Sequence, residues 1–318
     1  FDKAVYGLND VITCPLLFQK ENVLVASSRL SDCITGRFDP AGCWQKVWSY
    51  ILNWLDPAIN WTFTHWPLQV APSYGREEKL PAYAFKGSIE KGCGWFYKAR
   101  FFVDSSWEQL FLRRTGNGTM VEGPPVDPGL PAGDGSLGIL EGQVSRILAD
   151  GSQPYRWWNR ADDQAGAAYA LAMAGRFLKQ PGFLQTSRNL LNYLFIKSNL
   201  RAGPRNNNSS PSYGLIGWAT THANVYYGDD NARCILGLVG ASAYMHTSEW
   251  DTKILEAILA NFKTTGKEGF RGPRLSEQDI LKEGWKYFEN RDLINPHPHF
   301  ESWMWACYLW LYDKTGYK

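Results

Sequence analysis

Apolar residues recur at helical spacing through most of the chain after about Ser88, where a first helix is expected to begin. The same period predicts further helices near residues 162–178, 184–197, 229–246, 249–264, 277–289 and 299–314. Glycines and prolines crowd residues 116–135, which predicts a loop there. The pattern therefore predicts a mainly α fold.

The predicted helices alternate in kind. Ala165–Ala174 and Cys234–Ala243 are apolar on nearly every side, which is typical of helices buried all round. The helix after the second is amphipathic, with one apolar stripe formed by Ile254, Leu255, Ile258, Leu259 and Phe262. A buried helix followed by an amphipathic one, repeated, indicates concentric helical hairpins. We therefore expect an (α/α) toroid or a partial toroid.

The first part of the chain has a different pattern. The run Asn22–Ala26 predicts a short buried strand, and a helical repeat follows at Trp44–Leu55. We expect residues 1–57 to be an α/β remnant or the end of a preceding domain. The Pro-rich residues 58–87 are expected to connect it to the helical-hairpin region, residues 88–318.

An acidic motif occurs twice, each time where a buried-type helix is predicted to begin. The segment ADDQAG at residues 161–166 is echoed by GDDNAR at residues 228–233. A third helix of the same kind opens with Glu301 close to its start. Acidic groups thus recur at the starts of successive inner helices, and the repeated Gln/Asn-Ala indicates a shared local geometry.

In a toroid of hairpins the inner helices run parallel, so their N-termini and the loops before them form one mouth. These loops and starts carry aromatic, basic and histidine side chains, namely Trp157, Trp158, Arg160, Trp218, His222, Tyr227, Arg233 and His299. Rings can stack on sugars, while carboxylates and amides can bind their hydroxyls. The pattern predicts a sugar-binding mouth.

A structural explanation of the acidic residues stands beside this one. Asp is a preferred N-cap residue and suits the positive end of the helix dipole, so one Asp of each pair is expected to be a cap. Arg160 and Arg233 could grip an acidic sugar, but pairing with the nearby aspartates is favoured slightly. His297, His299 and Glu301 could ligate a metal, yet a hydrogen-bonding wall is favoured, and no metal or cofactor is expected.

Glu141 is a further candidate, because apolar residues and glycines flank it. Burial in such surroundings would raise its pKa, as a general acid requires. Alternatively, Glu141 is a buried structural residue paired to Arg146 or Arg156. The two interpretations carry equal weight here.

Composition narrows the classes of partner. The chain has 15 Trp, 16 Tyr and 16 Phe, which either pack large helices or stack on sugars. A net charge of +2 without a long basic run argues against nucleic acid as a partner. No stretch approaches the roughly 20 apolar residues of a membrane span.

The acidic motifs resemble the six-hairpin glycosidase superfamily, in particular its poorly characterised bacterial members. The segments that carry this resemblance are Arg160–Asp163, Tyr227–Arg233 and Glu301–Trp310. The resemblance implies an (α/α) barrel with paired carboxylates at the inner-helix mouth. A full ring needs more helices than the pattern predicts, so a fragment or an incomplete ring is expected. Residues 1–57 weakly resemble the last strand and helix of a glutamine-amidotransferase-like domain.

We therefore expect a glycoside hydrolase that acts on a polysaccharide-derived oligosaccharide, with uronate-containing sugars among the candidates. The carboxylates assigned to catalysis are Asp163, Asp230 and Glu141. Those assigned to caps or hydroxyl binding are Asp162, Asp229 and Glu301. The alternatives are a non-catalytic carbohydrate-binding or scaffold protein, and a sugar lyase or epimerase on the same toroid. A polysaccharide substrate would favour a secreted or periplasmic location.

Overall fold

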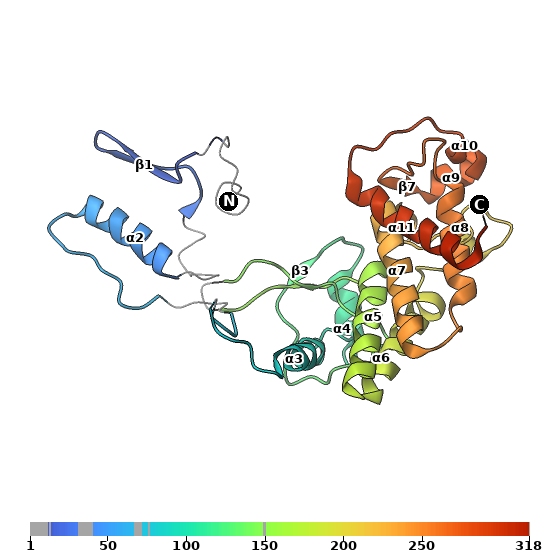
Figure 1. The fold of residues 1–318 in the computed structure, drawn as a ribbon, viewed down its shortest axis with the longest axis horizontal. Coiled ribbons are helices and arrows are strands. Elements are labelled where there is room, and N and C mark those ends of the chain that lie inside the picture. The colour runs from blue at the N-terminus through green and yellow to red at the C-terminus, as the bar shows by residue number, and fades with distance from the viewer. Residues whose placement is uncertain are drawn as a thin grey trace. The chain divides into compact units, whose positions relative to one another are not determined.

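The computed structural model describes residues 12, 14–30, 41–66, 72–75, 77–148 and 151–317. It is mainly helical, as the sequence pattern predicts (Figure 1). The chain divides into two compact units. Unit 1 holds residues 1–80 with 147–152, and unit 2 holds residues 81–146 with 153–318.

Unit 1 contains a hairpin and a helix. Strands β1 (Leu17–Lys20) and β2 (Val23–Ala26) pair antiparallel, and Glu21 in the turn has a positive φ of 54°. Helix α2 (Ala41–Leu55) confirms the helix predicted from the apolar repeat. The remaining residues of the expected α/β remnant, 1–11, 13 and 31–40, lie outside the described residues.

The strand predicted at residues 22–26 exists, but the prediction that it is buried is wrong. Val23 and Ala26 are exposed, and Leu24 and Val25 are only half-buried. An apolar run predicts extended structure through its side-chain types, whereas burial requires a covering layer, which the run itself cannot specify.

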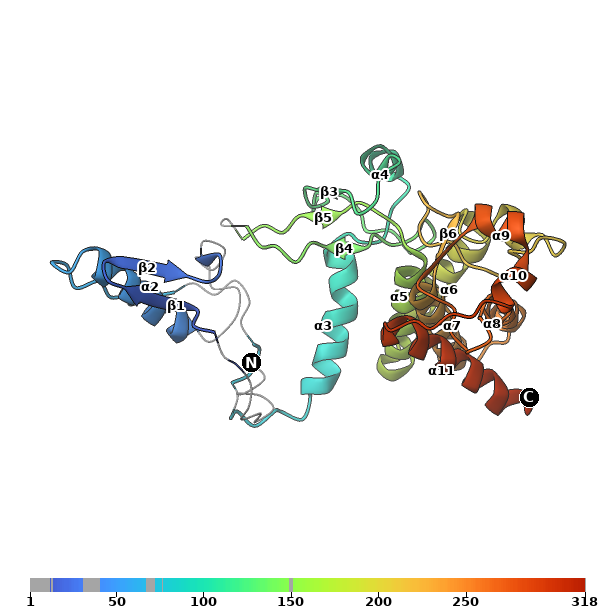
Figure 2. The same ribbon diagram turned by 90° about the horizontal axis from the view of Figure 1, so that it is seen from above.

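Unit 2 contains helices α3 to α11 (Figure 2). They are α3 (Ala84–Lys98), α4 (Glu108–Thr115), α5 (Ala161–Leu178), α6 (Pro181–Asn192), α7 (Gly228–Met245), α8 (Asp251–Lys263), α9 (Glu277–Glu283), α10 (Trp285–Glu289) and α11 (Pro298–Thr315). Most predicted helices are confirmed with their ends displaced by a few residues. The one predicted over residues 277–289 is broken at Gly284, whose φ is 71°. No helix among the described residues is long and apolar enough to cross a membrane.

Short strands hold the loops that precede the helices. Strands β3 (Glu122–Gly123), β5 (Tyr155–Arg156) and β4 (Gly142–Gln143) pair antiparallel in that order. Strand β6 (Val225–Tyr227) pairs antiparallel with β7 (Arg274–Ser276). The segment before β5 is therefore extended where it forms β4.

Helices α5 and α7 pack side by side and run in the same direction (Figure 1). A Cβ atom at Gly237 would lie 2.8 Å from the backbone of Ala165, and one at Gly240 would lie 2.6 Å from the ring of Tyr169. As the residue number rises in α7, the number of the residue that it contacts in α5 also rises, so the two helices are parallel. Glycine is required at Gly237 because any larger residue would meet the backbone of α5.

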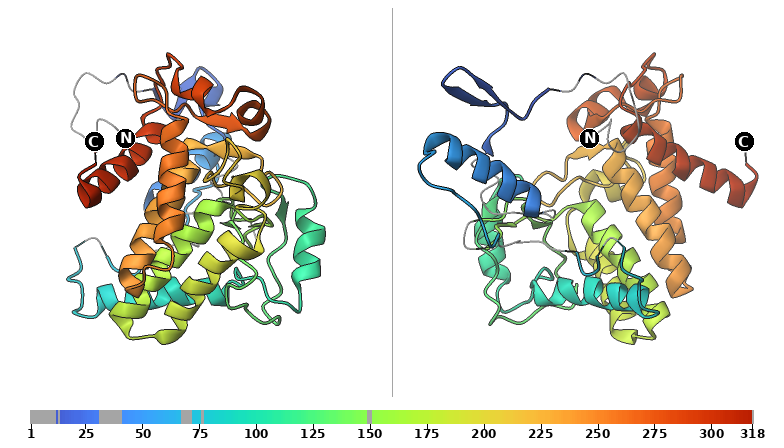
Figure 3. Two further views of the ribbon diagram at one scale, coloured as in Figure 1. Left: turned by 90° about the vertical axis from the view of Figure 1, so that its right-hand side faces the viewer. Right: turned by 60° about the vertical axis from the view of Figure 1, so that its left-hand side comes forward.

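Helix α11 continues this arrangement on the other side of α7. A Cβ atom at Gly228 would lie 3.2 Å from the carbonyl oxygen of Phe300, and the Cys307 thiol lies 3.6 Å from the carbonyl oxygen of Ala232. The N-termini of α5, α7 and α11 therefore lie at the same end of unit 2 (Figure 3).

Helices α6 and α8 run in the opposite direction, each against the parallel helix that precedes it. The Ser187 hydroxyl donates to the carbonyl oxygen of Ala168 at 2.7 Å, and Leu184 packs against Gly175. As the residue number rises in α6, its contact on α5 falls. The amide of Asn261, late in α8, donates to Asn231 near the start of α7 at 3.3 Å, so α5 and α7 are each followed by an antiparallel helix.

Two expectations about burial are wrong. In α8, Ile254 and Ile258 are buried, but Leu255, Leu259 and Phe262 of the same predicted stripe are exposed. In α11, which was grouped with the buried helices, the exposed large apolar residues are Trp303, Trp305, Leu309 and Tyr312. Apolar spacing shows which face of a helix can be covered, but the neighbouring elements determine how much of that face is covered.

We predict that Gly237→Ala lowers the free energy of unfolding by about 2 kcal/mol, because the new methyl group overpacks the α5–α7 contact. The matched control is Gly166→Ala in α5, where the glycine is exposed and a Cβ meets nothing within 4 Å. The control should raise the free energy of unfolding by roughly 0.5–1 kcal/mol, since alanine is the better helix former. Urea denaturation measures both, and equal stabilisation by the two variants would contradict the close approach.

Candidate functional site

The paired aspartates occupy the second and third positions of their helices. The N-cap residues are Arg160 for α5 and Tyr227 for α7, and neither makes a side-chain capping bond. The expectation that one Asp of each pair is an N-cap is therefore wrong. The N-cap of each helix lies two residues before the first Asp of its pair, so the aspartates lie inside the first turn, where the helix dipole still favours their charge.

The amide side chain that follows each Asp pair forms the same pair of hydrogen bonds with a loop backbone in both copies of the motif. Gln164 accepts a hydrogen bond from the backbone N–H of Ile139 at 2.9 Å and donates to its carbonyl oxygen at 3.0 Å. Asn231 accepts from the N–H of Ile216 at 3.1 Å and donates to its carbonyl oxygen at 2.8 Å. The shared local geometry predicted from the sequence echo is confirmed. Each amide fixes the loop before its own helix.

This docking places two different side chains at corresponding positions. Glu141 follows the docked Ile139 by two residues, and Trp218 follows the docked Ile216 by two residues. The carbonyl oxygen of Trp218 also accepts the first backbone N–H of α5, from Ala161, at 3.0 Å. One loop thus contributes a carboxylate to the mouth, and the other contributes an aromatic ring.

Arg160 joins the two helix starts. Its Nη2 donates to Asp162 Oδ2 at 2.9 Å and to Asp230 Oδ1, while Nη1 lies 3.5 Å from Glu141 Oε1. The side chains of Asp162 and Asp230 are only 5% and 6% exposed. A single half-buried guanidinium therefore contacts carboxylates that come from α5, from α7 and from the loop before β4.

Arg233 approaches the same carboxylates from α7. Its Nη2 lies 2.9 Å from Asp162 Oδ2, 3.1 Å from Asp230 Oδ1 and 3.5 Å from Asp229 Oδ2. The interpretation that Arg160 and Arg233 pair with the aspartates is confirmed. The Arg233 side chain is nevertheless 37% exposed, so it also reaches the surface of the mouth.

Glu141 is paired and buried. Arg156 Nη1 donates to its Oε1 at 2.7 Å, and Oε2 is buried without a hydrogen-bond partner among the described residues. Of the two partners that the sequence left open, Arg156 is correct. Arg146 instead pairs with Glu122 at 3.0 Å.

The pKa values of several carboxyls at the mouth are raised. Burial, followed by the charge of Asp230, raises the pKa of Asp162 to about 7, although Arg160 and Arg233 oppose the shift. Burial, followed by the charge of Asp162, raises the pKa of Asp163 well above its usual value. Asp163 Oδ2 is also buried without a hydrogen-bond partner among the described residues. The pKa of Asp229 is raised in the same direction, first by burial.

Trp157 and Trp158 do not bind sugar, which corrects the sequence-based assignment. They are 1% and 0% exposed. The indole of Trp157 donates to the carbonyl oxygen of Pro124 at 2.9 Å, and that of Trp158 donates to Thr221 Oγ1 at 2.7 Å. Both rings are therefore packed in the interior, where they are not exposed to a ligand.

Trp218 is a half-buried tryptophan beside the helix starts, and Trp303 of α11, 43% exposed, lies with its ring 5.9 Å from the guanidinium of Arg233. Trp218 packs edge-on over Trp158, with ring centroids 4.7 Å apart, and against Tyr227 at 4.9 Å. His222 lies 6.1 Å from it and contacts Thr221 Oγ1 through Nδ1 at 2.9 Å. Trp218, His222 and Tyr227 are all half-buried, so they offer an aromatic wall. The sequence signal that distinguishes Trp218 from the buried tryptophans is its position two residues after an isoleucine whose backbone is bound by a helix amide.

Glu301 has a structural role, which corrects its assignment as a cap or hydroxyl binder. Its carboxylate accepts hydrogen bonds from the backbone N–H groups of Arg271 and Gly272, both at 2.9 Å, and from the amide of Asn295 at 2.7 Å. The residue is 1% exposed. His299 lies exposed on the same helix with its ring against Phe300. Glu301 therefore holds the loop before β7.

Comparison of the chain with protein-family models, with curated proteins and with solved structures finds no match. The mouth itself combines carboxyls of raised pKa, carboxylates held by guanidinium groups, and an aromatic wall.

We predict that Gln164→Leu lowers the free energy of unfolding by about 2 kcal/mol, because it leaves the buried N–H of Ile139 without its partner and removes one donor to the carbonyl. Gln185→Leu is the matched control, since Gln185 is exposed on α6 and bonds only to Asn189. The control should change the stability by less than about 0.5 kcal/mol. Urea denaturation distinguishes the two, and similar losses for both would contradict the docking role.

Asp162 also predicts a pH dependence of stability. Its folded pKa of about 7 lies above its usual 3.8, so the folded state keeps a proton that the unfolded state has released. The resulting stabilisation is fully present below about pH 4 and is lost as the pH rises towards 7. The Asp162→Asn variant has no carboxyl to titrate at this position. Its free energy of unfolding should therefore fall less than that of the native protein between about pH 4 and pH 7. Asp313→Asn, on exposed α11 surface, should follow the native curve. Parallel curves for Asp162→Asn would contradict the raised pKa.

Proposed function

We propose that the chain is a glycoside hydrolase whose reacting groups lie at the starts of α5 and α7. Hydrolysis of a glycosidic bond needs a protonated carboxyl to donate to the leaving oxygen and an ionised carboxylate to activate water or to attack. The observation that carries the proposal is the presence of both kinds of carboxyl within one cluster. We assign Asp163, whose pKa is raised, as the first kind, and Asp230 and Glu141, which contact guanidinium groups, as the second.

Asp163 is the proposed acid. Burial and the nearby charge of Asp162 both favour its protonated form at neutral pH. Its Oδ2 has no hydrogen-bond partner among the described residues, so no described neighbour competes for it. Asp162, its neighbour in the sequence, instead bonds to Arg160 and Arg233 and serves to hold the two helix starts together.

Asp230 and Glu141 are the candidates for the ionised partner. Guanidinium groups favour the charged form of a carboxylate. Asp230 Oδ1 contacts Arg160 and Arg233, and Glu141 Oε1 contacts Arg156 and Arg160. The second oxygen of each carboxylate lies outside these pairs, and that of Glu141 is buried without a hydrogen-bond partner among the described residues.

The surroundings fit an oligosaccharide. Trp218 and Tyr227 offer ring faces and edges for the apolar side of a sugar, and Arg233 reaches the surface of the mouth with its guanidinium. Arg233 could pair with a substrate carboxylate, which supports a uronate among the substrates. The parallel helices α5, α7 and α11, with antiparallel α6 and α8, support an (α/α) toroid or partial toroid, in keeping with the resemblance to six-hairpin glycosidases.

The test is release of sugar from a panel of plant and microbial oligosaccharides, including uronate-containing ones. Asp163→Asn should lower turnover by at least about a hundredfold while binding persists, because the amide cannot donate the acidic proton. Asp313→Asn should leave turnover unchanged. Adding azide, a small anionic nucleophile, should restore turnover to truncated variants Asp230→Ala or Glu141→Ala, and the restored variant identifies the ionised partner.

Other outcomes would replace the proposal. Turnover that survives Asp163→Asn but disappears in His222→Ala would favour a lyase or an epimerase. Binding without release of any sugar by the native chain would favour a non-catalytic carbohydrate-binding protein.

A further inference from the structure

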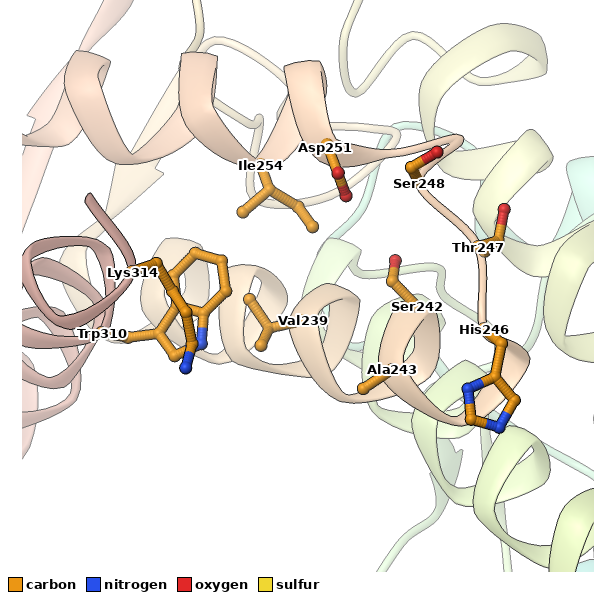
Figure 4. A pocket seen from close by; sticks show the side chains of 10 residues that line it. All are labelled: Val239, Ser242, Ala243, His246, Thr247, Ser248, Asp251, Ile254, Trp310 and Lys314. Carbon is orange, nitrogen blue, oxygen red and sulfur yellow. The ribbon is translucent and has the colours of Figure 1, made fainter.

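A separate pocket of about 410 Å³ lies at the other end of α7 from the acidic mouth. It is formed by the last turn of α7, the loop and first turn that begin α8, and the C-terminal half of α11 (Figure 4). Ser242 in this pocket follows Asp230 by twelve residues of the same helix. At 1.5 Å per residue, the two sites are roughly 18 Å apart along α7.

The most informative group in the pocket is the hydroxyl of Ser242. The residue is 6% exposed, and its Oγ has no hydrogen-bond partner among the described residues. A serine in a helix commonly bonds back to the carbonyl four residues earlier, but Ser242 makes no such bond. Figure 4 shows the hydroxyl directed into the space between α7 and α8. A buried hydroxyl without a partner destabilises the fold, so a ligand hydroxyl that bonds to it would remove a penalty.

The other walls of the pocket are of two kinds. Trp310, Val239 and Ile254 provide an apolar surface, on which the half-buried indole of Trp310 is the largest group. Asp251, in the first turn of α8, is exposed and makes no ion pair or hydrogen bond with another described residue through its carboxylate. Lys314 stands at the α11 edge and pairs with Asp313 at 3.0 Å.

This combination defines the class of ligand. A sugar ring has an apolar C–H face and a polar edge of hydroxyls, which match Trp310 on one side and Ser242 with Asp251 on the other. A purely apolar ligand would bury the Asp251 charge without a partner, at a high cost. A strongly anionic ligand would be repelled by the same carboxylate.

We infer that this pocket is a second carbohydrate-binding site, which takes a neutral sugar ring of an oligosaccharide. The class of ligand rests on the proposed function, whereas the position of the site rests on the pocket and its unpartnered hydroxyl. The pocket contains no pair of adjacent carboxyls, so it binds sugar without cleaving it. It would hold part of a polysaccharide fragment away from the mouth and raise the affinity for longer chains.

The test uses the full chain carrying Asp163→Asn and Trp218→Ala, which block turnover and weaken binding at the mouth. Isothermal titration is performed with neutral tetrasaccharides of glucose, xylose and mannose as separate probes. In this background Trp310→Ala should weaken binding by about tenfold, as truncation of an aromatic anchor does. Tyr312→Ala, an exposed aromatic residue of α11 outside the pocket, should leave the affinity unchanged.

Ser242→Ala provides a second measurement that misfolding cannot imitate. It removes a hydroxyl that has no partner, so the free energy of unfolding should stay the same or rise, while affinity falls about fivefold. Failure of every probe to bind, or binding that neither pocket variant alters, would overturn the inference. Either result would leave the hydrolase proposal standing if the native chain releases sugar. Binding lost on Trp310→Ala in a protein that never releases sugar would support the pocket and reject the hydrolase.

Discussion

The close parallel approach of α5 and α7 is the constraint on which the mouth depends. Because Gly237 meets the backbone of Ala165, the two helices come close enough for Asp162 and Asp230 to share the same guanidinium groups. Two carboxylates in one buried volume repel each other, and burial adds to the cost of charging them. Arg160 and Arg233 offset part of that cost, and the remainder appears as raised pKa values. The chemistry of the mouth is thus a consequence of helix packing.

The amides of Gln164 and Asn231 explain how loops can be positioned as firmly as the helices. Each side chain substitutes for a neighbouring strand by satisfying both backbone groups of an isoleucine. A loop that lacked this bond would leave buried polar groups unpaired. The groups that follow two residues later, Glu141 and Trp218, are therefore carried on backbone fixed to the helix start. Sites built on fixed elements hold their geometry better than sites on free loops.

Carboxylates that look alike in the sequence have different roles because their surroundings differ. Glu301 accepts three hydrogen bonds from a loop and is fully occupied by that task. Asp163 lies in the corresponding part of another helix, but one of its oxygens is buried without a described partner. The two carboxyls therefore differ in their surroundings, and such differences also distinguish structural carboxyls from acid–base carboxyls in enzymes generally. Residue type and helix position alone do not distinguish them.

The sequence by itself determined the helices, the repeat of the acidic starts and the equivalence of Gln164 with Asn231, since these depend on local periodicity and on short-range motifs. It did not determine that Trp157 and Trp158 are buried while Trp218 is only half-buried, or that Leu255, Leu259 and Phe262 in the apolar stripe of α8 are exposed. Those outcomes depend on which distant segment covers each side chain. The pairing of Arg160 with carboxylates from three segments, and the raised pKa values that follow, also required the tertiary structure, because burial and charge act through space between residues that are far apart in the chain.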